Sequence, residues 1–364
     1  MESPLQFFAG IKDPRVERTK DHLLIDIIFI TISAVICGAE TWNDIEAFGK
    51  AKQEWLKSFL KLPNGIPTHD TFNRVYAALD ATELGQNFLS WTQSVTRQTE
   101  GEVISIDGKA LRGSRHHGNK SIVHMVSAWA GVNNIVLGQQ KVDSKSNEIT
   151  AIPPLLAVLV LKGCIVTIDA MGCQKDIALA IVDKEADYIL AVKGNQKELH
   201  QQLQESFRFI HPQSVDQEID LGHGRIEKRM CSVIHDLSMI EQKDEWAKLH
   251  SLIKIDAERQ IKSTGESQKE TRYYISSLQA DAQQLNRCIR SHWKIENSLH
   301  WILDVAFHED QSRKRAGNAA ENFSVINRIA LNLLKNELTT KQGIKGKRLK
   351  AGWSIDYLEK VLNI

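Results

Sequence analysis

Two short apolar runs in this chain end in the same dipeptide, Ile-Asp. The first is Val103–Asp107 and the second is Cys164–Asp169. Both have the length and β-branched composition of buried strands, so each aspartate stands where a central strand ends. A carboxylate in that position is rigidly held and can reach solvent. Each also has an ordinary alternative: Asp107 precedes a glycine, as in a hairpin corner, and Asp169 suits the N-cap of a following helix.

The segments around these runs predict the order of the elements. Two further β-rich stretches, Ser121–Ala130 and Asn134–Val142, are separated by a turn, and a helix over about 151–161 leads to the second run. One more helix and one more strand follow. Three strands, then helix, strand, helix and strand, is the order of a ribonuclease H-like fold, in which the first and fourth strands lie side by side. That arrangement brings Asp107 and Asp169 to the same end of the sheet.

The texture of the sequence divides the chain into units. Helical periodicity dominates the N-terminal part, and strand-like runs begin after it. A later stretch is polar and of mixed period, which indicates a mostly β insertion. The fold class is therefore α/β, and the expected units are a helical N-terminal domain over 1–98, a ribonuclease H-like core over 99–340 with an insertion at about 195–271, and a basic C-terminal tail with a short helix over 341–364.

Bulk properties exclude several classes of protein but select none. The 364 residues carry a net charge of +1, so any DNA contact must come from local clusters of Lys and Arg. The five cysteines are scattered, which indicates reduced thiols in a cytoplasmic protein and neither a zinc ribbon nor a disulfide framework. The apolar run Leu23–Cys37 is too short to span a membrane, so we expect a buried helix there. No glycine-rich nucleotide-binding motif occurs.

A third carboxylate, Glu296, lies on a long helix expected from Asp281 to about Leu303. Most helical glutamates are solvated, which is the ordinary interpretation. His292 and His300 lie four residues to either side, so one helix face presents His-Glu-His, and a zinc or iron site is a further alternative. Two histidines eight residues apart are separated by about 12 Å, too far for one ion, and the spacing differs from the H-E-x-x-H of zinc peptidases.

Several blocks of sequence, in order along the chain, resemble one known family. They are HDTFNRVYAALD, VISIDGKALRGS, KSNEITAIPPLL, TIDAMGCQKDIA, DYILAVKGNQ, HGRIEKR, RYYISS and HWKIENSLHWILDVAFHED. These blocks are similar to the H-repeat-associated proteins of Rhs elements, a group of bacterial insertion-sequence transposases of the DDE type. The resemblance covers almost the whole chain, and many blocks in one order are far more specific than any single motif.

The resemblance implies an enzyme that cleaves DNA and transfers strands at the ends of an insertion sequence. Its three carboxylates map onto Asp107, Asp169 and Glu296, which would be both the catalytic residues and the ligands of two Mg²⁺ ions, with Mn²⁺ as a substitute. The implied partners are double-stranded DNA, namely the inverted repeats at the transposon ends and the target DNA; assembly as a homodimer stays open. The helical domain over 1–98 resembles a transposase-associated domain and is a further candidate for DNA binding.

The chain departs from the family around Glu296. Related transposases often carry a Tyr-x2-Arg-x3-Glu-x6-Lys signature there, and this chain has Ile289, His292 and Leu303 at the other three positions. The usual Tyr, Arg and Lys contacts to DNA are therefore unassigned. Basic residues elsewhere are as often solvated as bound to DNA. The candidates for contacts to DNA phosphates, three of them beside Glu296, are Lys109, Arg112, Arg115, Lys193, Arg225, Arg290, His292 and Lys294.

Two other functions stay open on the sequence alone. A ribonuclease H-like nuclease would hydrolyse DNA without mobilising it, and a domesticated relic would bind DNA without cutting it. All three carboxylates are present, which argues against the relic. Inverted repeats on either side of the gene would separate a transposase from a nuclease.

Overall fold

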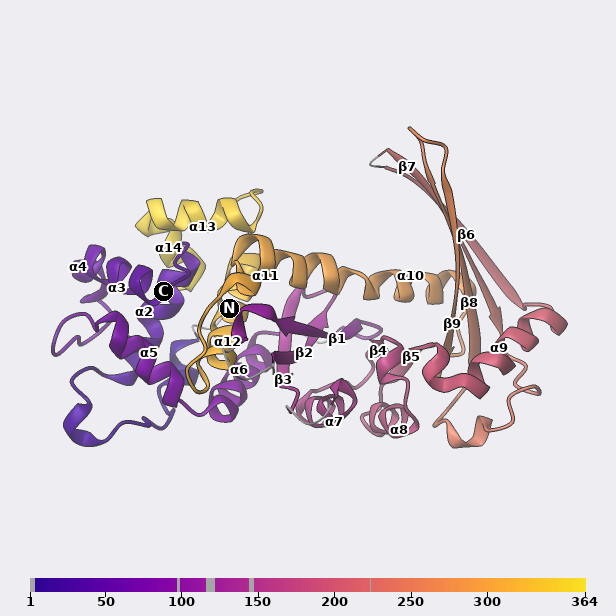
Figure 1. Cartoon of the computed structure of the whole chain (residues 1–364), viewed down its shortest axis with the longest axis horizontal. Coiled ribbons are helices and arrows are strands. Elements are labelled where there is room, and N and C mark those ends of the chain that lie inside the picture. The colour runs from indigo at the N-terminus through magenta and orange to yellow at the C-terminus, as the bar shows by residue number, and fades with distance from the viewer. Residues whose placement is uncertain (1–3, 97–98, 116–121, 144–146, 223) are drawn as a thin grey trace.

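The computed structural model describes residues 4–96, 99–115, 122–143, 147–222 and 224–364. Three regions follow one another along the molecule (Figure 1): a helical end, a central sheet covered by helices, and an antiparallel blade of strands that projects from the body.

One mixed sheet runs from the centre of the molecule into the blade. Among the described residues it has nine strands in the order β3-β2-β1-β4-β5-β9-β8-β7-β6. β1 (Val103–Leu111) pairs antiparallel with β2 (Val123–Ala130) and parallel with β4 (Ile165–Ile168). β5 (Asp187–Val192) continues parallel to β4, and β3 (Ile135–Lys141) forms the edge beside β2. The predicted ribonuclease H-like arrangement is confirmed. Ser121, the expected start of the second strand, lies outside the described residues.

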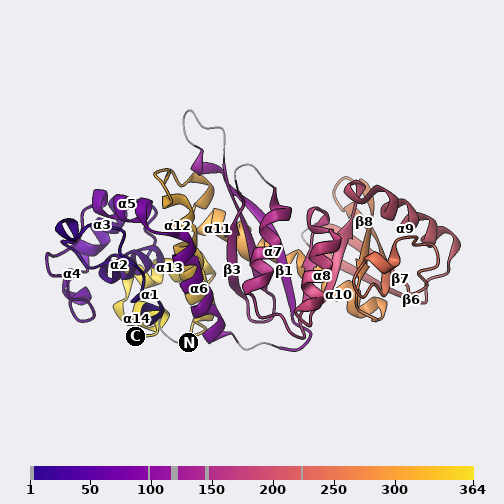
Figure 2. The same ribbon diagram turned by 90° about the horizontal axis from the view of Figure 1, so that it is seen from below.

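Helices cover both faces of the half-sheet formed by β1 to β5. α7 (Glu148–Val158) and α8 (Lys175–Asp183) pack on the face that carries Ile106 and Val166. α10 (Ala282–His292) packs on the other face, because alternate residues of a strand point to opposite sides. Figure 2 shows α7 and α8 on the near side of the strands. α7 begins three residues earlier than the sequence pattern indicated.

The insertion extends the central sheet into the blade and does not form a separate unit. It opens with a helix that the sequence analysis missed, α9 (Lys197–Phe209), which buries Leu199 and Leu203 four residues apart. The predicted strand Arg272–Leu278 is the second half of a longer strand that pairs with β5. The strands of the blade are β6 (Ser214–Gly222), β7 (Arg225–Ile234), β8 (Ser251–Ile261) and β9 (Ser267–Ser276).

The helical end combines the two ends of the chain in one hydrophobic core. The apolar run predicted as a buried helix is α2, every residue of which is buried except Ile25. In the described part of the chain, no helix is long and apolar enough to cross a membrane. The domain limits at residues 98 and 340 stay a prediction. The helices that share this core are α1 (Leu5–Phe8), α2 (Leu24–Ile36), α3 (Trp42–Ala51), α4 (Gln53–Leu56), α5 (His69–Ala78), α6 (Ala81–Val95), α12 (Ala319–Asn336), α13 (Ile344–Trp353) and α14 (Ile355–Leu362).

The helix predicted from Asp281 to about Leu303 is present but is not uniform. Asp281 caps α10 by accepting a hydrogen bond from the Gln284 amide at 2.8 Å. After α10 comes a π-helical segment, Glu296–His300, and then α11 (Trp301–Ala306). π-helical segments of this kind are rare and are often found at functional sites. Here the segment begins at the glutamate that the sequence analysis selected.

Candidate active site

The two Ile-Asp runs form neighbouring parallel strands. Ile106 lies opposite Ile168 in the β1–β4 ladder, so the aspartates that follow them stand side by side at one edge of the sheet. β1 does not turn at Asp107, which pairs with Ser127 while the strand continues to Leu111. The hairpin-corner alternative is therefore wrong. Asp169 does act as a cap: its Oδ1 accepts a hydrogen bond from the Met171 amide at 3.1 Å, on a single 3-10 turn.

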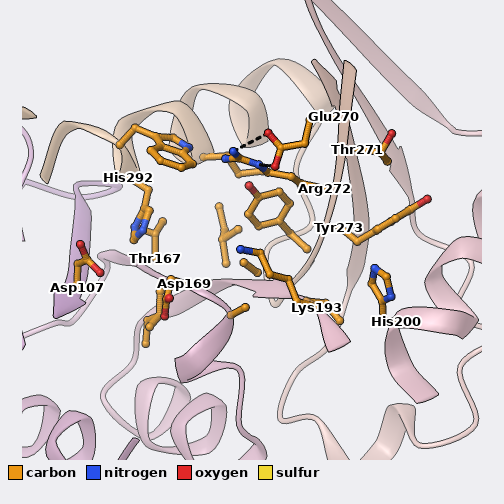
Figure 3. Close-up of a pocket in the computed structure, with 18 of the residues that line it drawn as sticks. Asp107, Thr167, Asp169, Lys193, His200, Glu270, Thr271, Arg272, Tyr273 and His292 are labelled. Atoms are coloured by element: carbon orange, nitrogen blue, oxygen red, sulfur yellow. Dashed lines mark hydrogen bonds and ion pairs between the residues drawn. The ribbon is translucent and has the colours of Figure 1, made fainter. Parts of the chain in front are cut away.

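Glu296 reaches the same cavity from the opposite side. A cavity of about 410 Å³ is lined by all three predicted carboxylates, although they come from two strands and a helix. Figure 3 shows Asp107 and Asp169 on one side of this cavity, His292 beside them, and Arg272 with Glu270 on the far side. Among the described residues, no three His, Cys, Asp or Glu side chains stand close enough to share one metal ion. The carboxylates thus surround one space without converging on a single point.

The charges in this cavity are in conflict. Burial raises the pKa of Asp107 to about 7, and the nearby carboxylates of Asp169, Glu148 and Glu296 raise it further. Burial and the charge of Asp169 also raise the pKa of Glu148. A divalent cation is the natural relief for such a conflict, and oxygen donors alone suit Mg²⁺. The donor set therefore fits the metal that the family resemblance implies.

Glu148 is a carboxylate of this site that the sequence analysis missed. It is the first residue of α7, and its side chain lies directly against the backbone of Gly108. A β-carbon at Gly108 would stand only 2.2 Å from Glu148 Oε1, so a glycine is needed beside Asp107 for this approach. The only signal in the sequence was its place just before an apolar helix, which many solvated residues share.

The two histidines beside Glu296 have separate partners. His292 Nδ1 lies 3.0 Å from the Thr167 hydroxyl, and burial lowers the pKa of His292. His300 Nδ1 lies 3.4 Å from Asp107 Oδ2. Burial lowers the pKa of His300 to about 3, and the charges of nearby cations lower it further, so the imidazole is neutral. The histidines therefore contact strand residues and do not join Glu296 in a His-Glu-His metal site.

The basic residues predicted to contact DNA divide into two groups. Lys109 is buried, and its Nζ donates to Asp304 Oδ1 at 2.6 Å and Oδ2 at 2.8 Å. Arg290 donates to Glu218 at 3.0 Å and to Asp220 at 2.6 Å, and Arg225 lies 3.1 Å from Glu227. These three therefore hold carboxylates of the protein. By contrast, the exposed candidates are Arg112, Arg115, Lys193 and Lys294, of which Lys193 lines the cavity.

A second cationic group that the sequence did not indicate closes the far side of the cavity. Arg272, on β9, donates to Glu270 at 2.6 and 2.8 Å, and its guanidinium lies 4.5 Å from the ring centroid of Trp293. The cavity thus has carboxylates at one end and an arginine, a lysine and an aromatic ring at the other. This distribution can hold a phosphate between a cation site and positive side chains.

Replacing Asp107 by asparagine is expected to stabilise the metal-free protein at pH 8. The folded state binds a proton at Asp107 more tightly than the unfolded state, so its stability falls as pH rises from about 4 to 7. A pKa of about 7 against an ordinary 3.8 corresponds to about 4 kcal/mol at most, and we expect a gain of several degrees in melting temperature. The gain should shrink at pH 5.

Thermal unfolding in EDTA at pH 5 and pH 8 measures this difference. Asp183→Asn is the matched control, because Asp183 is exposed on α8 and distant in role from the cavity. Identical melting temperatures of wild type and Asp107→Asn at pH 8 would contradict the charge conflict.

The fold and the carboxylates together define a ribonuclease H-like protein with an acidic site of the DDE type. Comparison with known families places the chain within this class. Residues 98–333 match the family described as Transposase DDE domain, and residues 5–92 match the family described as DDE_Tnp_1-associated. The chain belongs to the DDE transposase family.

Several individual proteins are similar to this chain over nearly their whole length. "Putative transposase YncI" of Escherichia coli O157:H7 is 45% identical, and the alignment covers 100% of this chain and 95% of YncI. "H repeat-associated putative transposase YhhI" of E. coli K12 is 41% identical, covering 98% of this chain and 97% of YhhI. A solved structure, piggyBac transposase in a synaptic complex with hairpin DNA, aligns with a TM-score of 0.49 and 11% identity over 100% of this chain and 81% of that one. That structural likeness carries no part of the assignment.

Proposed function

We propose that this protein is an active transposase that cleaves DNA strands at the ends of its insertion sequence and joins them to target DNA. One observation carries the proposal: carboxylates from β1, β4 and the π-helical segment line a single cavity although they are far apart in the sequence. Asp107, Asp169 and Glu296 would hold two Mg²⁺ ions, and Glu148 stands close enough to assist them. Bound there, the ions would activate the attacking oxygen and stabilise the leaving oxygen of a phosphodiester.

The protein's own residues would bind and orient the DNA strand. The exposed side chains of Arg112, Arg115 and Lys294 would neutralise phosphates outside the cavity, and Lys193 a phosphate at its mouth. His292 presents its ring from the cavity wall, where its Nδ1 is occupied by Thr167. The substrates we propose are double-stranded DNA with the inverted repeats of the transposon ends and a target duplex.

Cleavage should depend on a divalent cation. Purified protein is expected to nick a duplex carrying its own inverted-repeat end in Mg²⁺ or Mn²⁺ and to be inactive in EDTA, with activity restored by excess Mg²⁺. The physical reason is that the three carboxylates have no positive side chain between them to counter the phosphate charge. Denaturing gels of an end-labelled strand measure nicking. Full activity in chelator would exclude the metal-dependent mechanism.

The same reaction with a supercoiled target plasmid separates the transposase from a nuclease of the same fold. A transposase joins the cleaved 3′ end to the plasmid and yields a labelled circular or linear product. A nuclease yields only nicked donor DNA, which would reject the strand-transfer part of the proposal.

A further inference from the structure

Asp107 has one neighbour in the structure that the proposed reaction does not use. His300 is the last residue of the π-helical segment that Glu296 begins, and its Nδ1 lies 3.4 Å from Asp107 Oδ2. The imidazole is only 12% exposed, and its other nitrogen, Nε2, is buried with no hydrogen-bond partner among the described residues. A buried ring nitrogen without a partner is costly, so it calls for an explanation.

A buried arginine behind His300 has the complementary deficiency. Arg328, on α12, is fully buried, and its Nη1 donates to Glu309 Oε1 at 2.8 Å and to the Ser324 carbonyl at 3.0 Å. Its Nε and Nη2 are also buried without a partner among the described residues. Its charge acts on His300, so the two side chains are close to one another. Donors without an acceptor therefore stand near an acceptor without a donor.

These contacts leave one satisfactory tautomer for the histidine. A neutral imidazole carries a proton on one nitrogen and a lone pair on the other. With the proton on Nε2, His300 would turn a donor toward the N–H groups of Arg328 and a lone pair toward the carboxylate of Asp107. With the proton on Nδ1, His300 donates to Asp107 and accepts from Arg328. The second arrangement satisfies both neighbours.

We propose that Glu309, Arg328 and His300 form a buried relay that positions Asp107. Glu309 holds Arg328, Arg328 donates toward His300 Nε2, and His300 Nδ1–H donates to Asp107 Oδ2. His300 is thus a positioning residue, because it acts on the reaction only through the orientation of a proposed metal ligand. The inference rests on the proposed function for the role of Asp107, but the tautomer itself does not depend on catalysis.

Nitrogen-15 NMR of histidine-labelled, metal-free protein tests the tautomer directly. The chain has 13 histidines, and the spectrum of His300→Asn identifies the signal of His300 by its disappearance. We expect a neutral ring with the proton on Nδ1, and we expect Glu309→Gln to shift that signal. A proton on Nε2, or a doubly protonated ring, would overturn the relay whatever the activity of the protein.

Two substitutions of equal polarity test the positioning role. Asparagine places its amide near the position of Nδ1, whereas glutamine places it near that of Nε2. We expect His300→Asn to bind Mn²⁺ within about threefold of wild type, and His300→Gln to weaken it by about 10-fold or more, the usual effect of losing such a partner. Calorimetric titration measures Mn²⁺ affinity, and thermal unfolding shows that both variants are folded.

The outcomes separate failure of the relay from failure of the proposed function. Equal affinities for Mn²⁺ in the two variants, or a greater loss in His300→Asn, would show that His300 only fills space and would overturn the relay. Wild-type protein that binds no Mn²⁺ in this cavity would reject the proposed metal site, while the NMR result would still decide the tautomer.

Discussion

Asp107→Asn is expected to reduce strand nicking by about a thousandfold while DNA binding persists. Asparagine keeps the shape of the side chain but removes one negative charge from the centre of the acidic cavity, where Asp107 feels three other carboxylates. Loss of a metal-holding charge costs several kcal/mol of transition-state stabilisation, and each 1.4 kcal/mol is about tenfold in rate. Affinity for DNA should stay the same or rise slightly, because one repulsion with phosphate is removed. Nicking and gel-shift affinity are measured on the same duplex.

Arg112→Ala is the matched variant with the opposite expectation. The Arg112 side chain is 80% exposed and is held only by a 3.4 Å ion pair with Asp310, so it is free to meet a phosphate. Its removal should weaken binding, with a shallower dependence of affinity on salt, and leave the response to metal unchanged. If Asp107→Asn nicks DNA at the wild-type rate, Asp107 is not a ligand of the catalytic metal.

The sequence predicted the sheet well because strand physics is local. Val103–Asp107 and Cys164–Asp169 are apolar on both faces, as strands covered by helices on both sides must be, and their parallel pairing follows from the order of the elements between them. The Asp-Gly pair was ambiguous on the same local grounds. A turn and a glycine required by a neighbour look alike in sequence, and only the contact between Gly108 and Glu148 distinguishes them.

Side chains whose role depends on distant partners could not be predicted in this way. Glu148 and Arg272 enter the cavity because of tertiary packing, and neither has a spacing or flanking pattern that marks it. α9 was missed for a related reason: its apolar residues are few, and the polar composition of the segment indicated strands. Positive charge near the first aspartate had the same limit, because a lysine facing solvent and a lysine facing a buried carboxylate are identical in sequence.

The block HWKIENSLHWILDVAFHED now has a physical interpretation as a whole. Its glutamate faces the cavity, His300 touches Asp107, and Asp304 and Asp310 both bind Lys109. The helix that carries Glu296 is therefore tied to β1 on both sides of Asp107. This connection fixes the distance between a strand carboxylate and a helix carboxylate that must act on the same phosphate.

Lys109→Met is expected to destabilise the protein by about 3 kcal/mol without changing the salt dependence of DNA binding. The Lys109 side chain is 7% exposed and donates to Asp304 at 2.6 and 2.8 Å and to Asp310 at 3.3 Å. Methionine keeps the apolar stem but leaves two carboxylates facing each other without a cation, and breaking a buried ion pair typically costs about 3 to 5 kcal/mol. The lower end applies because Asp304 is 34% exposed.

Denaturant unfolding and gel shifts at several salt concentrations decide between the two roles of Lys109. Adding Asp304→Asn to Lys109→Met should recover part of the lost stability, because it removes one of the stranded charges, so the two substitutions should not be additive. Lys193→Met is the control: Lys193 is exposed at the cavity, so its loss should weaken DNA binding and leave unfolding nearly unchanged. If Lys109→Met instead unfolds like wild type and flattens the salt dependence, Lys109 leaves Asp304 to bind DNA, and the tie between β1 and α11 is not structural.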